Sequence, residues 1–181
     1  LRVRTLANMG GYTRNSGVAI QLLIGPWVST SIYDITNIDF QFTAVLTNTA
    51  PTGPYRGAGR PEAIYIIERL MDAAARKLGL DPAELRRRNM IRPEQMPYKN
   101  AMGQSYDSGS FEKIMDQALV AADWQGFAAR AAESAKAGKL RGRGIATFLE
   151  WTGGNVFEER VTVAVKANRE IEIYATTQAM G

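Results

Sequence analysis

Residues 50–63 read APTGPYRGAGRPEA, and a strong helical pattern follows them at once. The stretch holds three glycines, three prolines and two arginines. Gly57 and Gly59 allow positive φ angles or a close approach of another group to the backbone. Pro61 suits the first turn of a helix, where N–H groups lack helical partners and lie at the positive end of the dipole. These features are typical of an anion-binding loop, although a glycine-rich connector with two solvated arginines has the same composition.

Hydrophobic periodicity predicts the elements on both sides of this loop. Strict alternation of apolar and polar residues predicts strands, and apolar positions three and four residues apart predict helices. The predicted strands are residues 1–7, 38–46, 144–151, 160–166 and 170–174, with a hairpin turn at 167–169. The predicted helices are residues 16–24, 61–78, 82–91, 111–122 and 127–137, whereas residues 100–110 are predicted to be a loop. We therefore expect an α+β fold of mixed strands with a central group of amphipathic helices.

Single residues mark the ends of these helices. Gly25 and Pro26 are expected to end the first helix, and Gly79 to cap the helix at 61–78 in a left-handed conformation. Asp81 is expected to be the N-cap of the next helix, with Pro82 at its first position.

Composition and charge exclude several classes of protein. The 181 residues are 45% apolar and 22% charged, as in an ordinary globular protein. A net charge of +4 is too small for a nucleic-acid footprint. Because the chain has no cysteine and no histidine, zinc-finger, thiol-protease, serine-triad and iron–sulfur sites are excluded within it. A chain without disulfides fits the cytoplasm, with the periplasm as the alternative, and no apolar run is long enough to cross a membrane.

Two further stretches could carry chemistry. Residues 176–181, TTQAMG, offer hydroxyl and amide groups after a strand, although a plain turn is the simpler interpretation. Residues 150–155 place Trp151 and a carboxylate beside two glycines, although such a tryptophan more often belongs to a core or an interface.

The remaining charged residues are expected to be structural. Four helical carboxylates have spacings that suit caps and surface ion pairs, namely Glu62, Glu68, Asp72 and Glu84. The basic clusters at residues 86–88 and 136–143 are expected to be solvated helix ends.

Several motifs match one family together. They are MGGY at residues 9–12, NTAPTGPYRGAGRPEA at 48–63, the ERLMD of the next helix, GLDPAELRRRNMI at 79–91 and TTQAMG at 176–181. With these motifs the chain resembles the molybdopterin-binding large subunit of the molybdenum hydroxylases. That family includes xanthine dehydrogenases, aldehyde oxidases and aerobic carbon-monoxide dehydrogenases. The resemblance runs along essentially the whole chain, and PYRGAGRPEA with DPAELRRRN is its most specific part.

The resemblance implies a piece of a longer subunit. Residues 1–140 would be the C-terminal part of a first molybdopterin-binding lobe, and residues 141–181 the first strands of a second lobe. The implied cofactor-binding residues are Tyr55, Arg56, Gly57, Met180 and Gly181, and the implied substrate-pocket residues are Ala58 and Trp151. No catalytic residue or metal ligand is expected within the chain, because the glutamate base of the family would follow Gly181.

Departures from the family pattern narrow the implied substrate. Gly57 stands where carbon-monoxide dehydrogenases carry a copper-binding cysteine, and Ala58 stands where purine-oxidising members have a phenylalanine. Ile24 lies about where those members have a substrate-orienting arginine. The resemblance therefore implies oxidation of an aldehyde or an N-heterocycle with oxygen from water.

The resemblance also implies partners. Iron–sulfur clusters and FAD on other subunits or domains would carry the electrons away, within an oligomeric parent enzyme. The chain alone is expected to be inactive and to hold no cofactor stably. The rival hypothesis is a non-catalytic binding or interaction domain on the same scaffold.

Overall fold

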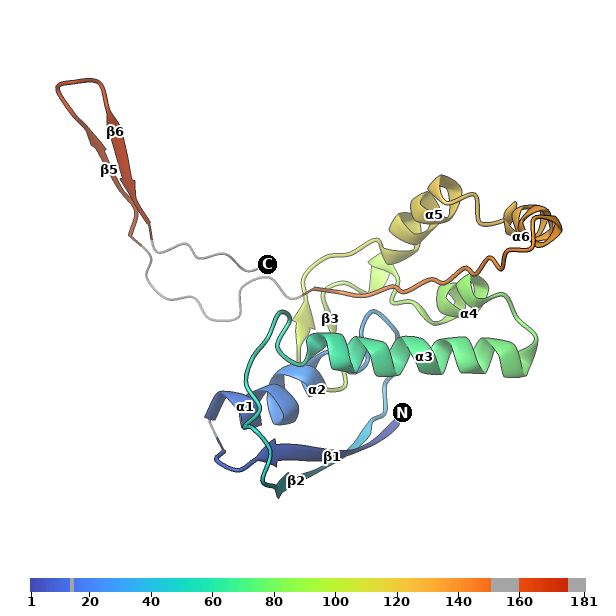
Figure 1. The fold of residues 1–181 in the computed structure, drawn as a ribbon, viewed down its shortest axis with the longest axis horizontal. Helices are drawn as coiled ribbons and strands as arrows, with labels where there is room; N and C mark the ends of the chain where they lie inside the picture. Colours follow the sequence, from blue (N-terminus) through green and yellow to red (C-terminus); the bar gives the residue numbers. More distant parts are fainter. Residues whose placement is uncertain (14, 151–159, 176–181) are drawn as a thin grey trace. The chain divides into compact units, whose positions relative to one another are not determined.

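The computed structural model describes residues 1–13, 15–150 and 160–175 of the chain. Its contacts divide the chain into two units, residues 1–149 and residues 150–181. The assignment of residues 1–140 and 141–181 to two lobes stays a prediction. The α+β class is confirmed, since helices and short strands alternate in the first unit (Figure 1).

The first unit begins with two parallel strands, β1 (Arg2–Gly10) and β2 (Asp39–Leu46), paired in register from Arg2 opposite Asp39. Parallel strands need a long crossover between them, and the crossover here is helical. It consists of α1 (Asn15–Ala19), a π-helical turn η1 (Ile20–Ile24) and α2 (Gly25–Trp27). Figure 1 shows this crossover between the strand pair and the long helix α3 (Arg60–Leu78).

The sequence predicted that the first helical segment ends at Gly25 and Pro26. In the structure the helix continues through both residues. The Gly25 N–H donates to the Ile20 carbonyl, which closes the wider π turn. Pro26 then lies in the first turn of α2, where its missing N–H leaves no bond unmade, and the helix continues to its C-cap Val28.

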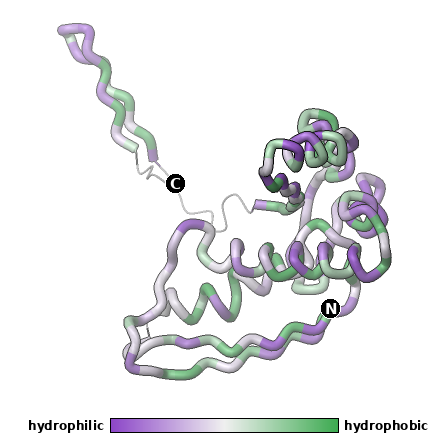
Figure 2. Tube along the Cα trace, turned by 45° about the vertical axis from the view of Figure 1, so that its right-hand side comes forward, coloured by the Kyte–Doolittle hydropathy of each residue, from purple (hydrophilic) through white to green (hydrophobic). Residues whose placement is uncertain are grey.

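Helix α3 confirms the strongest sequence prediction, with Gly79 in the left-handed conformation at its C-cap. Figure 2 shows hydrophobic and hydrophilic positions alternating along it. The buried stripe contains Ala63, Ile67, Met71 and Ala75, four residues apart. Their three- and four-residue spacing in the sequence predicts that Leu70 and Leu78 also lie on the buried face, but these side chains are 48% and 63% exposed.

Four further helical elements follow in the first unit. Helices α4 (Pro82–Asn89), α5 (Phe111–Ala121) and α6 (Phe127–Lys136) follow α3, and a 3-10 turn η2 (Pro93–Gln95) follows α4. Helix α4 ends two residues earlier than predicted, because Met90 is extended and the Ile91 N–H donates to the Ile32 carbonyl. No helix among the described residues is long and apolar enough to cross a membrane.

A small antiparallel hairpin overlaps the predicted loop at residues 100–110. Strand β3 (Tyr98–Lys99) precedes the predicted loop, strand β4 (Ser105–Tyr106) lies within it, and the two strands pair with each other. The buried Asn100 side chain fixes the turn, since its Oδ1 accepts hydrogen bonds from the N–H groups of Met102 and Gln104 at 3.0 and 2.8 Å.

Residues 144–150 form no strand, contrary to the prediction, because side chains of the helices take their backbone hydrogen bonds. The Thr147 N–H donates to Glu68 Oε2 at 2.9 Å, and the Ile145 carbonyl accepts from Arg86 Nη2 at 3.1 Å. Ile145 and Leu149 also pack against the core.

Glu68 and Arg86 form the centre of a buried polar network, which corrects the prediction that both lie on the surface. The Arg86 side chain is 0% exposed and Glu68 7%, and Arg86 Nε donates to Glu68 Oε2 at 2.9 Å. Arg86 also donates to Asp72 and to the carbonyls of Pro82 and Glu68. The Tyr33 hydroxyl donates to Glu68 Oε1 at 2.5 Å, and burial beside this carboxylate raises the tyrosine pKa.

Arg143 is a second exception to the predicted solvated clusters. Its guanidinium lies 4.0 Å from the ring centre of Trp124 and 4.8 Å from that of Phe127. Its Nη1 donates to the Trp124 carbonyl at 2.9 Å. Cation–π contact therefore holds the chain after α6 against the helices.

Asp81 caps helix α4 as predicted. Its Oδ1 accepts from the N–H groups of Ala83 and Glu84, and its Oδ2 accepts from Trp124 Nε1 at 3.0 Å. Burial acts to raise the pKa of this carboxyl, but these hydrogen bonds and the nearby Arg143 charge lower it overall.

We expect Asp81→Ala to lower the free energy of unfolding by about 1 kcal/mol at neutral pH, the usual cost of a lost cap. Because the folded-state pKa is lowered, the stability that Asp81 contributes is present above its ordinary value of 3.8 and is lost as the pH falls further. Urea unfolding at pH 7 and pH 3 measures both effects. Asp107→Ala, at an exposed aspartate, is the control, and an equal loss for Asp81→Ala at the two pH values would contradict the expectation.

The described part of the second unit is a hairpin, which confirms the predicted turn. Strands β5 (Thr162–Val165) and β6 (Ile171–Tyr174) pair antiparallel, with Val163 opposite Ile173.

Candidate cofactor-binding site

The loop between β2 and α3 is built from two successive turns. The Ala58 N–H donates to the Tyr55 carbonyl at 3.0 Å, with Gly57 at φ 77°. The Arg60 N–H then donates to the Gly57 carbonyl at 3.1 Å. Ala58 and Gly59 lie in this second turn at φ 47° and 92°. The second turn leads directly into helix α3.

At Gly59 the backbone of this loop packs closely against the crossover helix. A Cβ on Gly59 would lie 2.5 Å from the Ile20 carbonyl oxygen and 3.1 Å from the Gly25 nitrogen. A Cβ on Gly25 would in turn lie 2.8 Å from the Gly59 carbonyl oxygen. Only glycine fits at both positions, so the loop is held at a fixed place over the π turn.

The tip of the loop carries donors that face no acceptor among the described residues. The N–H groups of Tyr55, Arg56 and Gly57 make no hydrogen bond there. The Arg56 guanidinium has no ion pair in the same described set, and it lies 5.9 Å from the ring centre of the exposed Tyr55. Backbone donors beside a fixed positive charge fit an anionic group such as a phosphate or a metal-bound sulfur ligand.

A cavity of about 320 Å³ adjoins this loop. Tyr55, Arg56 and Ala58 line it together, while Gly57 forms the turn between them. Its size is at the lower end of the range for small-molecule pockets. The structure therefore brings together four of the seven residues that the sequence nominated. Trp151, Met180 and Gly181 lie outside the described residues.

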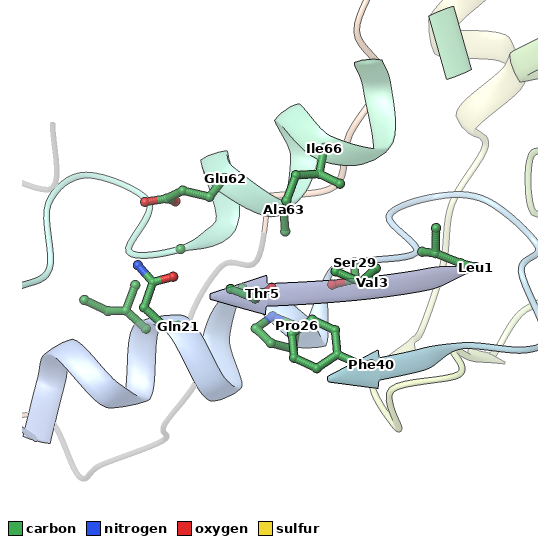
Figure 3. Close-up of a pocket in the computed structure, with 13 residues that line it drawn as sticks. Leu1, Val3, Thr5, Gln21, Pro26, Ser29, Phe40, Glu62, Ala63 and Ile66 are labelled. Atoms are coloured by element: carbon green, nitrogen blue, oxygen red, sulfur yellow. The ribbon is translucent and has the colours of Figure 1, made fainter. Parts of the chain in front are cut away.

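A second cavity of about 60 Å³ adjoins the first (Figure 3). It opens between β1, the crossover and α3, and Val3, Phe40 and Ile66 give it apolar walls. The two cavities share four lining residues, which are Ile20, Gln21, Gly59 and Glu62.

Gln21 and Glu62 were not nominated as site residues from the sequence. Gln21 is the single polar residue in the run VAIQLLI at residues 18–24, which is a signal that could have marked it. Glu62 was assigned to helix capping, and its place in the first turn of α3 agrees with that assignment. The cavity beside both side chains depends on the fold of the crossover, which the residue pattern does not define.

The described residues hold no group of three or more acidic side chains that could bind a metal ion.

Comparison with known proteins identifies relatives of this chain. Residues 1–90 match the family model of the molybdopterin cofactor-binding domain. The large subunit of nicotine 6-hydroxylase from Paenarthrobacter nicotinovorans is 32% identical over 163 residues, which are 84% of this chain and 20% of that protein. The carbon monoxide dehydrogenase large chain of Hydrogenophaga pseudoflava is 36% identical over 161 residues, again 84% and 20%.

A solved structure agrees over nearly the whole chain. Quinoline 2-oxidoreductase from Pseudomonas putida 86 superposes with a TM-score of 0.77 at 25% identity, covering 99% of this chain and 24% of that one. The chain thus spans about a fifth of the length of the curated relatives cited above.

Residues 1–90 accordingly carry a molybdopterin cofactor-binding domain. The chain belongs to the family of molybdenum hydroxylase large subunits, as its motifs implied.

Proposed function

We propose that this chain contributes one wall of the active site of a molybdenum hydroxylase that oxidises an N-heterocycle or an aldehyde with oxygen from water. The observation that carries the proposal is the loop tip beside a cavity, where Arg56 lies with three N–H groups that have no hydrogen-bond partner among the described residues. Two relatives are named for nicotine and quinoline, which supports the N-heterocycle. Gly57 in place of a copper-binding cysteine speaks against carbon monoxide.

Each loop residue has a proposed role. The N–H groups of Tyr55 and Gly57 would hold anionic oxygen or sulfur atoms of the cofactor, and Arg56 would neutralise their charge. Ala58 would leave room for the substrate because its side chain is small. The bound molybdenum cofactor supplies the redox chemistry that transfers oxygen from water to carbon.

The remaining assignments belong to the same proposal. Met180 and Gly181 would bind the pterin, and Trp151 would line the substrate pocket. Iron–sulfur and flavin subunits or domains would accept the electrons in an oligomeric complex. The lack of cysteine fits a cytoplasmic location. The chain by itself would be inactive, since no catalytic base is proposed within it.

The test uses the full-length protein co-expressed with its partner subunits. Molybdenum and pterin content are measured first, followed by dye reduction with a series of aldehydes and N-heterocycles. Stoichiometric cofactor with turnover of one of these substrates supports the proposal. A complex that is free of cofactor and inactive would instead support a non-catalytic binding domain on the same scaffold.

Arg56→Ala in that complex is expected to weaken cofactor retention roughly 10- to 100-fold, because a hydrogen bond to a charged group contributes about 1.5–3 kcal/mol. Molybdenum content after dialysis measures the loss. Arg76→Ala is the matched control, since Arg76 is an exposed arginine of α3 whose side chain has no partner among the described residues. Equal molybdenum content in the two variants would refute the role of Arg56.

A further inference from the structure

We propose that Gln21 and Glu62 form a hydrogen-bonding clamp for the polar edge of a nitrogen heterocycle in the cavity beside the Arg56 loop. This inference rests on the proposed function, because it deepens the account of the same site. Two ligands have the required chemistry. One is the pterin of the cofactor and the other is an N-heterocyclic substrate.

The two side chains come from separate elements of the fold. Gln21 lies in the π turn η1, and Glu62 lies in the first turn of α3. Both line both cavities, and Figure 3 shows them on the same side of the smaller one. The close contact of Gly59 with the π turn holds the backbones of the two elements close together.

Both side chains are available to a ligand. Neither the Gln21 amide nor the Glu62 carboxylate makes a hydrogen bond or an ion pair with any described residue. The Gln21 side chain is half-buried and is the single polar side chain of an apolar run. The helix dipole accounts for an acidic residue at position 62, but it gives no reason for an amide at position 21.

The chemistry of the pair is specific. A carboxylate accepts two hydrogen bonds, whereas a primary amide both donates and accepts. Together they complement an edge that presents ring N–H or amino donors beside a carbonyl acceptor. The 2-amino-4-oxo edge of a pterin has this pattern, and so does an N-heterocycle with a ring amide. Arg56, on the wall of the same cavity, supplies the opposite charge for anionic groups of the cofactor.

The experiment uses the full-length complex and the double variant Gln21→Leu, Glu62→Gln. Pterin content is measured by fluorescence after oxidative release. Dissociation constants are measured by calorimetry for quinazolin-4-one, which has a ring N–H and a carbonyl, and for quinoline, which has neither. Gln117→Leu, Glu94→Gln is the matched control, since both residues are exposed and away from the cavity.

If the clamp binds the pterin, the pterin content of the double variant falls about tenfold after dialysis, as expected for lost hydrogen bonds that include a charged acceptor. If it binds the substrate, pterin content is unchanged, the dissociation constant of quinazolin-4-one rises about tenfold and that of quinoline stays the same. If neither quantity differs from the control, the inference is wrong. A wild-type complex without pterin would refute the proposed function and this inference together, whereas a loaded wild type with an unchanged variant refutes only the inference.

Discussion

Arg86→Met is expected to lower the free energy of unfolding by about 3–5 kcal/mol, the usual cost of removing one partner of a buried ion pair. The substitution leaves the carboxylate of Glu68 without the guanidinium that lies 2.9 Å away. It also removes the guanidinium N–H groups that donate hydrogen bonds to the carbonyls of Pro82, Glu68 and Ile145. Methionine nearly fills the volume, so the loss reports mainly on charge and hydrogen bonding.

Urea unfolding followed by tryptophan fluorescence measures this loss. Arg88→Met is the matched control two residues along the same helix, because the Arg88 side chain is 58% exposed and, among the described residues, pairs only with Glu84 on the surface. Surface pairs of this kind contribute about 0–1 kcal/mol. A loss for Arg86→Met as small as that for Arg88→Met would show that the buried network does not stabilise the fold.

Gly59→Ala is expected to destabilise the protein by about 2–4 kcal/mol, which combines a left-handed backbone for alanine with a steric clash. The residue has φ 92°, and its new Cβ would lie 2.5 Å from the Ile20 carbonyl oxygen. Since the nearest atom belongs to the backbone of Ile20, a side-chain rotation cannot relieve the clash. The loop that carries Arg56 must therefore move away from the crossover.

Two measurements separate the effects of this substitution. The urea midpoint reports the loss of stability, and the molybdenum content of the full complex reports the displacement of the loop. Gly53→Ala is the control in the same loop, because no heavy atom lies within 4 Å of a Cβ built there. Wild-type molybdenum content in the Gly59 variant would contradict the proposed link between loop position and cofactor binding.

The sequence was most informative where local rules decide the structure. Helix α3, its left-handed Gly79 cap and the Asp81 cap of α4 follow from periodicity and from single residues. Strands β1 and β2 were predicted from alternation, but their parallel pairing was not. That pairing depends on a crossover helix whose continuation through Pro26 needs the π turn.

The buried network could not be predicted in this way. Arg86 and Arg88 belong to one run of three arginines, and helical spacing alone does not distinguish the buried residue from the exposed one. The difference arises because α4 packs against the carboxylates of α3. The same limit applied to the segment at 144–150, where alternation predicted a strand but the side chains of Arg86 and Glu68 take the backbone hydrogen bonds.

The candidate site was partly predictable. The glycines and Arg56 marked the loop as a possible anion site from residue types alone, and the motifs then associated it with a cofactor. Gln21 and Glu62 became candidates only when the structure showed that both side chains line the same two cavities. The pattern of residues identifies a loop whose glycines allow unusual backbone angles. The residues that line the cavity beside this loop can be identified only from the tertiary structure.

The hydrogen bond from Thr147 to Glu68 has a consequence for biosynthesis. The two residues are 79 positions apart in the chain, and the acceptor is made long before the donor. While the ribosome is still adding residues 100–140, α3 and α4 can pair, but the carboxylate of Glu68 still lacks the N–H of Thr147. Unit 1 therefore reaches its final polar core only when residues 145–149 have left the ribosomal tunnel, since a domain completes its folding once its last packed segment is available.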